Sequence, residues 1–233
     1  MPDAKDALQI HAFLKNGGNN RPVVPVKERS FELFGDEKRL DALKPSQLFA
    51  PGRLTLDILR CRNVPATLSC VPISRKASRP WLIVENEATF HSFCRLNGQI
   101  SLHAGIILGS GNAVLRATEF LASLLAPTGG KEFLYFGDLD REGIDIASRL
   151  HARLSASSSI CVSPAEDYYA WMLQNQGVTN DQTTVQFHAL NWFPPTLRTQ
   201  VAAALARVPR LAQEMIGWEL LCQKFHVCPD HPF

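Results

Sequence analysis

Residues 132–143, EFLYFGDLDREG, give the clearest indication of the fold in this sequence. Its first five residues are the kind of short, mostly apolar run that forms a buried strand, and a glycine and two aspartates follow at once. From residue 141 the apolar residues return at helical spacing. A strand, an acidic turn and a helix in succession predict a βα unit of a parallel sheet.

The same alternation continues on both sides of this stretch. It predicts strands at residues 81–84, 104–108, 132–136 and 159–162, with helices at 87–96, 112–125 and 141–154 between them. We therefore expect an α/β fold with a parallel four-stranded sheet flanked by helices. Residues 164–176 and 197–225 predict a C-terminal helical extension.

The first third of the chain has a different character. Residues 1–79 predict a mostly helical region, with helices near 5–15, around Phe31 and Phe34, at 36–43 and at 54–60. Residues 74–80 are polar and basic and end in a proline, which is typical of a linker. The expected domains are therefore residues 1–79 and residues 80–233.

Charge is divided unevenly between these regions. Residues 1–80 contain 14 Lys and Arg against 8 Asp and Glu, whereas residues 81–233 contain 10 against 14. A basic region joined to an acidic domain suits a polyanion that one part holds and the other processes, so we expect DNA as a partner. A solvated basic surface is the alternative interpretation.

The sequence also indicates the cellular compartment in which the protein resides. The six cysteines form no CxxC pair, and no apolar stretch reaches the roughly 18 residues of a membrane span. The N-terminus lacks the basic start and apolar run of a secretory signal. We expect a cytoplasmic protein that is not embedded in a membrane.

Polar residues follow three of the expected strands at the point where each ends. They are Glu85, the turn Gly109-Ser110-Gly111, and the pair Asp138 and Asp140. Because ligand sites of parallel sheets lie beyond the carboxyl ends of the strands, we expect these residues to converge. The turn could contact phosphate through the Ser110 hydroxyl or through its backbone N–H groups, and a plain tight turn is the alternative.

Asp138 and Asp140 are separated by one residue, so both carboxylates point to the same side of an extended strand end. Such oxygen ligands suit Mg²⁺, with Mn²⁺ as a substitute. A DxD pair alone is also typical of a loop or a helix cap. Its place after a buried strand, with Glu85 at the end of another, favours a metal site.

Glu85-Asn86 after one strand, a Gly-Ser-Gly turn after the next, and residues 137–143 after the third together resemble the Toprim (Rossmann-like) domain. This family joins topoisomerases, bacterial primases and small nucleases. The form of residues 137–146 is most similar to the topoisomerase VI A subunit and to JetD, the nuclease subunit of Wadjet plasmid-defence systems. Residues 210–214 also resemble a Gln-Glu segment in the C-terminal part of JetD.

The resemblance implies roles for three carboxylates. Asp138 and Asp140 correspond to the family's metal-binding pair and Glu85 to its strand-end glutamate, which either binds a second metal or transfers protons. It also implies Mg²⁺, a homodimer and a condensin-like ATPase complex as a partner. DNA and RNA both stay open as the substrate.

The tyrosines select one branch of this family. Related topoisomerases cleave with a tyrosine on a separate winged-helix domain, but the only tyrosines here are Tyr135, Tyr168 and Tyr169, and none precedes the Toprim-like segment. Hydrolysis by a metal-activated water needs no such residue. We therefore expect a Mg²⁺-dependent DNA endonuclease of the JetD type, acting in plasmid defence, with Glu85, Asp138 and Asp140 as catalytic and metal-binding residues.

Two other interpretations compete with the nuclease. One is a non-catalytic subunit that keeps a Toprim scaffold for DNA binding or assembly. The other is a haloacid dehalogenase-like phosphatase with Asp138 as nucleophile and Asp140 as general acid. That family places its DxD after the first strand and needs a later acidic pair after another strand. Here two strands precede Asp138, and Glu166-Asp167 lies at the start of a helix.

Several residues near these motifs have a structural interpretation. Glu87 and Glu142 could support metal ligands, but an acid in the first turn of a helix also favours the helix dipole. Gln213 and Glu214 are expected in an amphipathic helix with Leu211, Met215 and Trp218 as its apolar stripe, so a packing role is the default there.

Overall fold

The computed structural model describes residues 4–73, 79–175 and 185–228. The chain divides into two compact units, Met1–Pro65 and Ala66–Phe233. This division lies earlier than the boundary at residues 79/80 expected from the sequence. The reason is a strand that the sequence analysis missed, β3 (Cys70–Pro72), which pairs with β5 (Gly105–Leu108) and so ties its segment to the second unit. Residues 74–78 of the expected linker lie outside the described residues.

The first unit is mostly helical, as expected. It contains α1 (Ala4–Lys15), α2 (Val26–Phe34) and α3 (Arg39–Leu43), with short 3-10 helices at Gly18–Asn20 and Gln47–Phe49. A two-residue parallel pair joins β1 (Val24–Pro25) to β2 (Cys61–Arg62). The small core consists of Ile10, Val26, Leu33, Leu40, Leu59 and Cys61.

The prediction of a helix at residues 54–60 is wrong: residues 54–55 are irregular and residues 56–60 form turns. Arg60 has a left-handed φ of 51°, and its carbonyl oxygen accepts from the backbone N–H of Val24, which holds the end of this segment out of helical geometry. Arg29, which is 1% exposed, fixes this arrangement. Its Nε donates a hydrogen bond to the carbonyl oxygen of Leu59, and its Nη2 donates to those of Pro22 and Arg60.

The second unit is built on a five-stranded sheet in the order β3-β5-β4-β6-β7. The four expected strands are present as β4 (Trp81–Val84), β5, β6 (Glu132–Phe136) and β7 (Cys161–Pro164), and they run parallel. The added strand β3 is antiparallel and lies at one edge. The sheet is therefore mixed, and the prediction of four parallel strands was incomplete.

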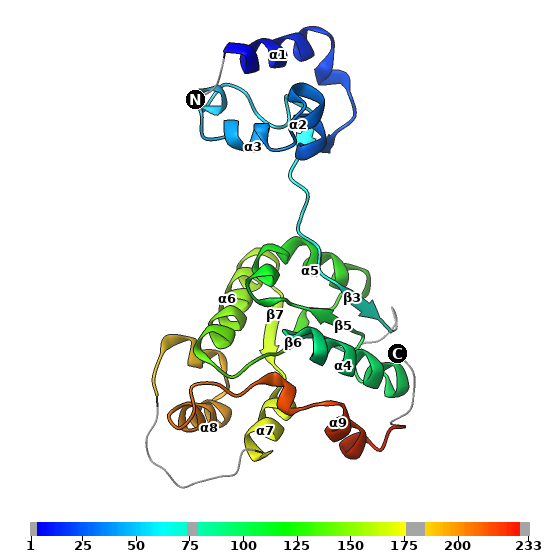
Figure 1. Ribbon diagram of the computed structural model, residues 1–233, viewed down its shortest axis with the longest axis vertical. Coiled ribbons are helices and arrows are strands. Elements are labelled where there is room, and N and C mark those ends of the chain that lie inside the picture. Colours follow the sequence, from blue (N-terminus) through cyan, green and yellow to red (C-terminus); the bar gives the residue numbers. More distant parts are fainter. Residues whose placement is uncertain (1–3, 74–78, 176–184, 229–233) are drawn as a thin grey trace. The chain divides into compact units, whose positions relative to one another are not determined.

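Helices cover both faces of this sheet (Figure 1). On one face, Leu82 and Val84 pack in a core with α4 (Glu87–Ile100), α7 (Glu166–Asn175), α8 (Pro195–Leu205) and α9 (Trp218–Phe225). On the other face, Trp81 and Ile83 pack with α5 (Thr118–Leu125) and α6 (Arg141–Ser158). All four residues of β4 are buried, as the central strand of such a sandwich requires.

Two expected helices differ from the structure. The stretch at residues 112–125 is a 3-10 helix, Gly111–Arg116, followed by α5. Gln213 and Glu214 lie in the 3-10 turn Gln213–Met215 rather than in a long amphipathic helix. The chain before this turn is extended because the backbone of Leu211 exchanges two hydrogen bonds with Leu139, at 3.0 and 2.9 Å.

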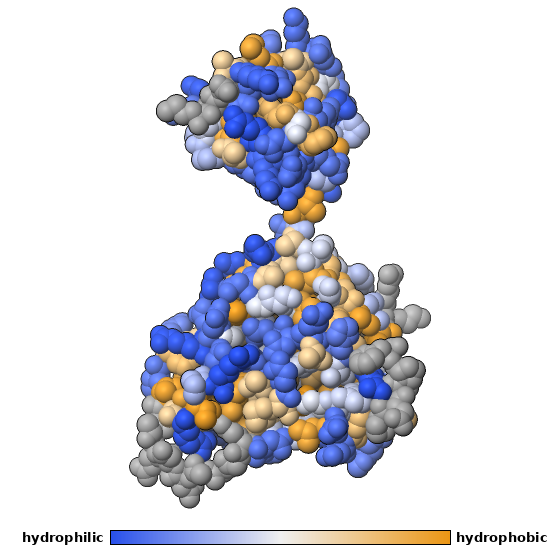
Figure 2. Space-filling view, in the orientation of Figure 1, coloured by the Kyte–Doolittle hydropathy of each residue, from blue (hydrophilic) through white to orange (hydrophobic). Residues whose placement is uncertain are grey.

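The surface is of mixed polarity. Figure 2 shows hydrophilic side chains over much of the visible face of each unit, with hydrophobic side chains between them. Within residues 4–73, 79–175 and 185–228, no helix is long and apolar enough to cross a membrane.

Candidate functional site

The residues expected to converge at the carboxyl edge of the sheet lie close together. Glu85 follows β4, whose last residue, Val84, is paired with Leu108 of β5 on one side and with Phe136 of β6 on the other. A Cβ atom placed on Gly143 would lie 3.3 Å from Oε2 of Glu85 and 3.4 Å from Oδ1 of Asp140. The three carboxylates therefore gather around the first turn of α6.

Glu85 lies in an unfavourable setting for a negative charge. Burial raises the pKa of Glu85 to about 7, and the neighbouring charges of Asp138, Asp140 and Glu142 add to this rise, while the backbone N–H of Asp138 opposes it. Its Oε2 atom is buried and makes no well-formed hydrogen bond in the described part of the chain, but the Tyr135 hydroxyl, which is also buried, interacts with this carboxylate. A proton, a cation or a hydrogen bond from Tyr135 would each satisfy such an oxygen.

Asp138 is held on both oxygens. It is 7% exposed, and its Oδ1 accepts hydrogen bonds from the backbone N–H of Gln213 at 2.7 Å and from Nδ2 of Asn86 at 3.3 Å. Its Oδ2 accepts from Nη2 of Arg210 at 2.5 Å. The orientation of this carboxylate is therefore fixed by three donors, two of which come from the C-terminal segment.

Asp140 has a structural role in addition to its place at the site. It is the N-cap of α6, and its Oδ1 accepts a hydrogen bond from the backbone N–H of Gly143 at 2.7 Å. Its Oδ2 lies 3.7 Å from Nε of Arg210. Asp140 is therefore a helix cap, as the alternative interpretation of the DxD pair expected, and it also faces the site.

The glycine turn borders the site at the end of β5. The backbone N–H of Gly109 donates to the carbonyl oxygen of Val84 at 2.7 Å, and Ser110 and Gly111 have left-handed φ angles of 52° and 58°. A Cβ atom on Gly111 would lie 4.0 Å from Oε1 of Glu85. From this turn Asn112 also donates to Glu142 at 3.3 Å, which links it to α6. Ser110 is exposed.

Two residues of the site were not predicted from the sequence. Gln213 is fully buried, and its side chain accepts from the backbone N–H of Asn86 at 3.0 Å and donates to the carbonyl oxygen of Phe136. It therefore braces the ends of β4 and β6. Arg210 forms the ion pairs with Asp138 and Asp140. The only sequence signal for either was the resemblance of residues 210–214 to a Gln-Glu segment.

The donor set suits Mg²⁺ in kind, because the carboxylates of Glu85, Asp138 and Asp140 provide hard oxygen ligands. Their present arrangement is that of an ion-paired cluster. Among the described residues, no group of three or more His, Cys, Asp or Glu side chains is already disposed to hold a metal ion. The guanidinium of Arg210 lies against the Oδ2 atoms of both aspartates.

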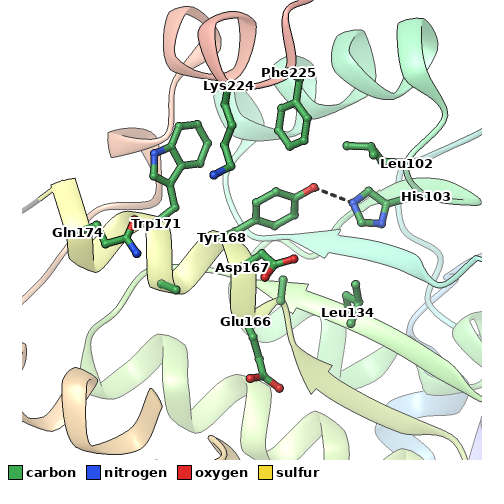
Figure 3. A pocket seen from close by; sticks show the side chains of 12 residues that line it. Leu102, His103, Leu134, Glu166, Asp167, Tyr168, Trp171, Gln174, Lys224 and Phe225 are labelled. Atoms are coloured by element: carbon green, nitrogen blue, oxygen red, sulfur yellow. Dashed lines mark hydrogen bonds between the residues drawn. The ribbon is translucent and has the colours of Figure 1, made fainter. Parts of the chain in front are cut away.

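A separate cavity of about 450 Å³ lies between α7, α9 and the start of β5 (Figure 3). Its lining includes Tyr168, Trp171 and Lys224, and Nε2 of His103 is hydrogen bonded to the Tyr168 hydroxyl at 2.9 Å. Burial lowers the pKa of His103 to about 4. The lining also contains Glu166 and Asp167 but none of the three clustered carboxylates.

Comparison of the chain with models of known protein families finds a match to one family. Residues 55–225 match the family model described as Wadjet protein JetD, C-terminal. No curated protein and no solved structure matches the chain.

Proposed function

We propose that this chain, which belongs to the Wadjet protein JetD C-terminal family, is a Mg²⁺-dependent endonuclease of Toprim type. Its proposed role is to cut DNA in plasmid defence. The observation that carries the proposal is the cluster of Glu85, Asp138 and Asp140 at the carboxyl ends of two adjacent parallel strands. The buried carboxylate of Glu85, whose pKa is raised by burial and by these acidic neighbours, supports a cation there.

The three carboxylates would hold Mg²⁺, or Mn²⁺ in its place. When bound, such a cation neutralises the charge of a phosphate and lowers the pKa of a water. The residues of the chain supply orientation: the Asp138 carboxylate is fixed by the N–H of Gln213 and by Asn86, and the Asp140 carboxylate by the first turn of α6.

Glu85 is also suited to proton transfer. A carboxyl group whose pKa is about 7 exchanges its proton readily near neutral pH, which is the requirement for general acid–base chemistry. The ligand role and the proton-transfer role both remain within the proposal, because both need Glu85 next to Asp138.

The tyrosines support hydrolysis over covalent cleavage. Tyr135, Tyr168 and Tyr169 are the only tyrosines of the chain, and they are 0%, 6% and 1% exposed. Burial raises the pKa of each hydroxyl, which weakens it as a nucleophile. A water molecule is therefore the proposed nucleophile.

The proposed partners follow from the charge distribution and from the family. The excess of basic residues in residues 1–80, of which Arg75, Lys76 and Arg79 lie beyond the first unit, supports DNA binding by this N-terminal part of the chain. A homodimer and a multi-subunit Wadjet complex containing a condensin-like ATPase are proposed from the resemblance. Cytoplasmic location is proposed with them.

The test is a cutting assay on supercoiled plasmid with Mg²⁺, Mn²⁺ or EDTA. We expect nicked or linear product with either metal and none with EDTA, and we expect Asp138→Asn and Asp140→Asn to cut at least about a hundredfold more slowly. Asp145→Asn is the matched control, because it removes an exposed acid from α6 whose ion pair among the described residues is with Arg149 at the surface. Equal cutting by wild type and Asp138→Asn would rule out this site.

A second candidate is a non-catalytic subunit that binds DNA. The ion pairs of Arg210 with Asp138 and Asp140 favour it, since they satisfy the aspartates without a metal. It predicts salt-sensitive DNA binding by the folded protein with no metal-dependent product in the same assay.

A further inference from the structure

Arg210 is placed where a cation of the site would bind. Its Nη2 lies 2.5 Å from Oδ2 of Asp138, and its Nε lies 3.7 Å from Oδ2 of Asp140. We propose that Arg210 is an internal counter-ion that competes with a divalent cation for these two oxygens, so that binding of the metal displaces the guanidinium. This inference rests on the proposed function.

The competition follows from which oxygens are free. Oδ1 of Asp138 is occupied by the N–H of Gln213 and by Asn86, and Oδ1 of Asp140 by the N–H of Gly143. The backbone N–H groups of Gln213 and Gly143 belong to the framework of the site and cannot move away without rearranging the chain there. The Oδ2 atoms are therefore the oxygens through which the two aspartates would ligate a metal, and Arg210 holds both.

The guanidinium can leave without disturbing the backbone around it. The side chain of Arg210 is 54% exposed, so water can solvate it when it moves away. Its segment stays attached through the backbone pairing of Leu211 with Leu139 and through the buried Gln213. The cost of displacement is therefore limited to ion pairs that are screened by solvent on one side.

The charge of the cluster gives the reason for such a counter-ion. Glu85, Asp138, Asp140 and Glu142 lie close enough for the other three to raise the pKa of Glu85. Without a positive charge, their repulsion would destabilise the folded site. Arg210 lowers this repulsion, and its removal leaves a cluster with greater attraction for a divalent cation.

The experiment is a calorimetric titration of the full chain with Mn²⁺ alone, in the absence of DNA. We expect Arg210→Gln to bind Mn²⁺ about tenfold more tightly than wild type. Arg210→Lys, which keeps the charge, should stay close to wild type. Arg149→Gln is the matched control, because it removes one positive charge from the surface of α6, and its affinity should equal that of wild type.

A second readout covers the stability of the variants. We expect Arg210→Gln to melt at a lower temperature than wild type without metal and to gain more from added Mn²⁺. Equal or weaker Mn²⁺ binding by Arg210→Gln would overturn the competition while leaving the metal site intact. Absence of Mn²⁺ binding in wild type, Arg210→Gln and Arg210→Lys alike, with all three folded, would overturn the metal-dependent function as well.

Discussion

The backbone N–H of Gln213 donates a hydrogen bond to Oδ1 of Asp138 at 2.7 Å, across 75 residues of sequence. The side chain of the same glutamine bonds the backbone of Asn86 and of Phe136, immediately beyond β4 and at the end of β6. One buried residue of the C-terminal segment thus sets the positions of the strand ends that carry Glu85 and Asp138. The C-terminal extension is part of the candidate site.

Gln213→Ala should lower the free energy of unfolding by about 2–3 kcal/mol, because it removes the partner of the buried Phe136 carbonyl and of the half-buried Asn86 N–H and opens a cavity. Urea denaturation of the full chain measures this loss. Gln174→Ala is the matched control on the exposed part of α7 and should change stability by less than about 0.5 kcal/mol. Similar values for the two variants would contradict a bracing role for Gln213.

Glu85 should make stability depend on pH. Because its folded-state pKa is raised from 4.5 to about 7, the stability it contributes is fully present below pH 4.5 and is lost as pH rises through about 7. Glu85→Gln stays neutral, so its stability advantage over wild type should grow between pH 5 and pH 8, by an amount on the order of 1–3 kcal/mol. Melting temperatures across this range, without divalent metal, measure the difference.

The control for this series is Glu87→Gln, which removes an exposed carboxylate two residues away. Its melting temperature should run parallel to that of wild type over the same pH range. A constant difference between Glu85→Gln and wild type would show that Glu85 is not protonated in the folded protein near neutral pH.

Two substitutions of Asp140 should distinguish its role as the N-cap of α6 from its proposed role as a metal ligand. Asn is as good an N-cap as Asp, so Asp140→Asn should retain stability to within about 0.5 kcal/mol, whereas Asp140→Ala should lose about 1 kcal/mol. Both variants should lose metal-dependent cutting. Urea unfolding measures stability, and the plasmid assay measures cutting. If Asp140→Asn kept both its stability and its cutting rate, Asp140 would act only as the cap of α6.

Gly143 should not tolerate a methyl group although it lies in a helix. A Cβ atom there would lie 2.7 Å from the carbonyl oxygen of Asp138, so Gly143→Ala should destabilise the protein by about 1–3 kcal/mol. Gly98→Ala is the matched change in α4, where nothing lies within 4 Å, and it should stabilise by up to about 1 kcal/mol. Thermal melts of the two variants should therefore shift in opposite directions.

Local patterns in the sequence predict the α/β class, the four parallel strands, and the gathering of Glu85, Asp138 and Asp140 at one edge. These features are local, since each strand is a short apolar run and each acidic residue directly follows one. Parallel strands bring their carboxyl ends to the same edge of a sheet, so local patterns were enough to predict that the three residues meet.

The residues that surround those carboxylates depend on how distant segments of the chain pack together. Arg210 and Gln213 reach Asp138 through the pairing of Leu211 with Leu139, and β3 joins the sheet through its pairing with β5. Neither contact leaves a periodic pattern, because a single backbone bridge or a three-residue edge strand is too short to show one. The free energy that selects these contacts comes from satisfying buried polar groups, and it depends on how the whole chain packs.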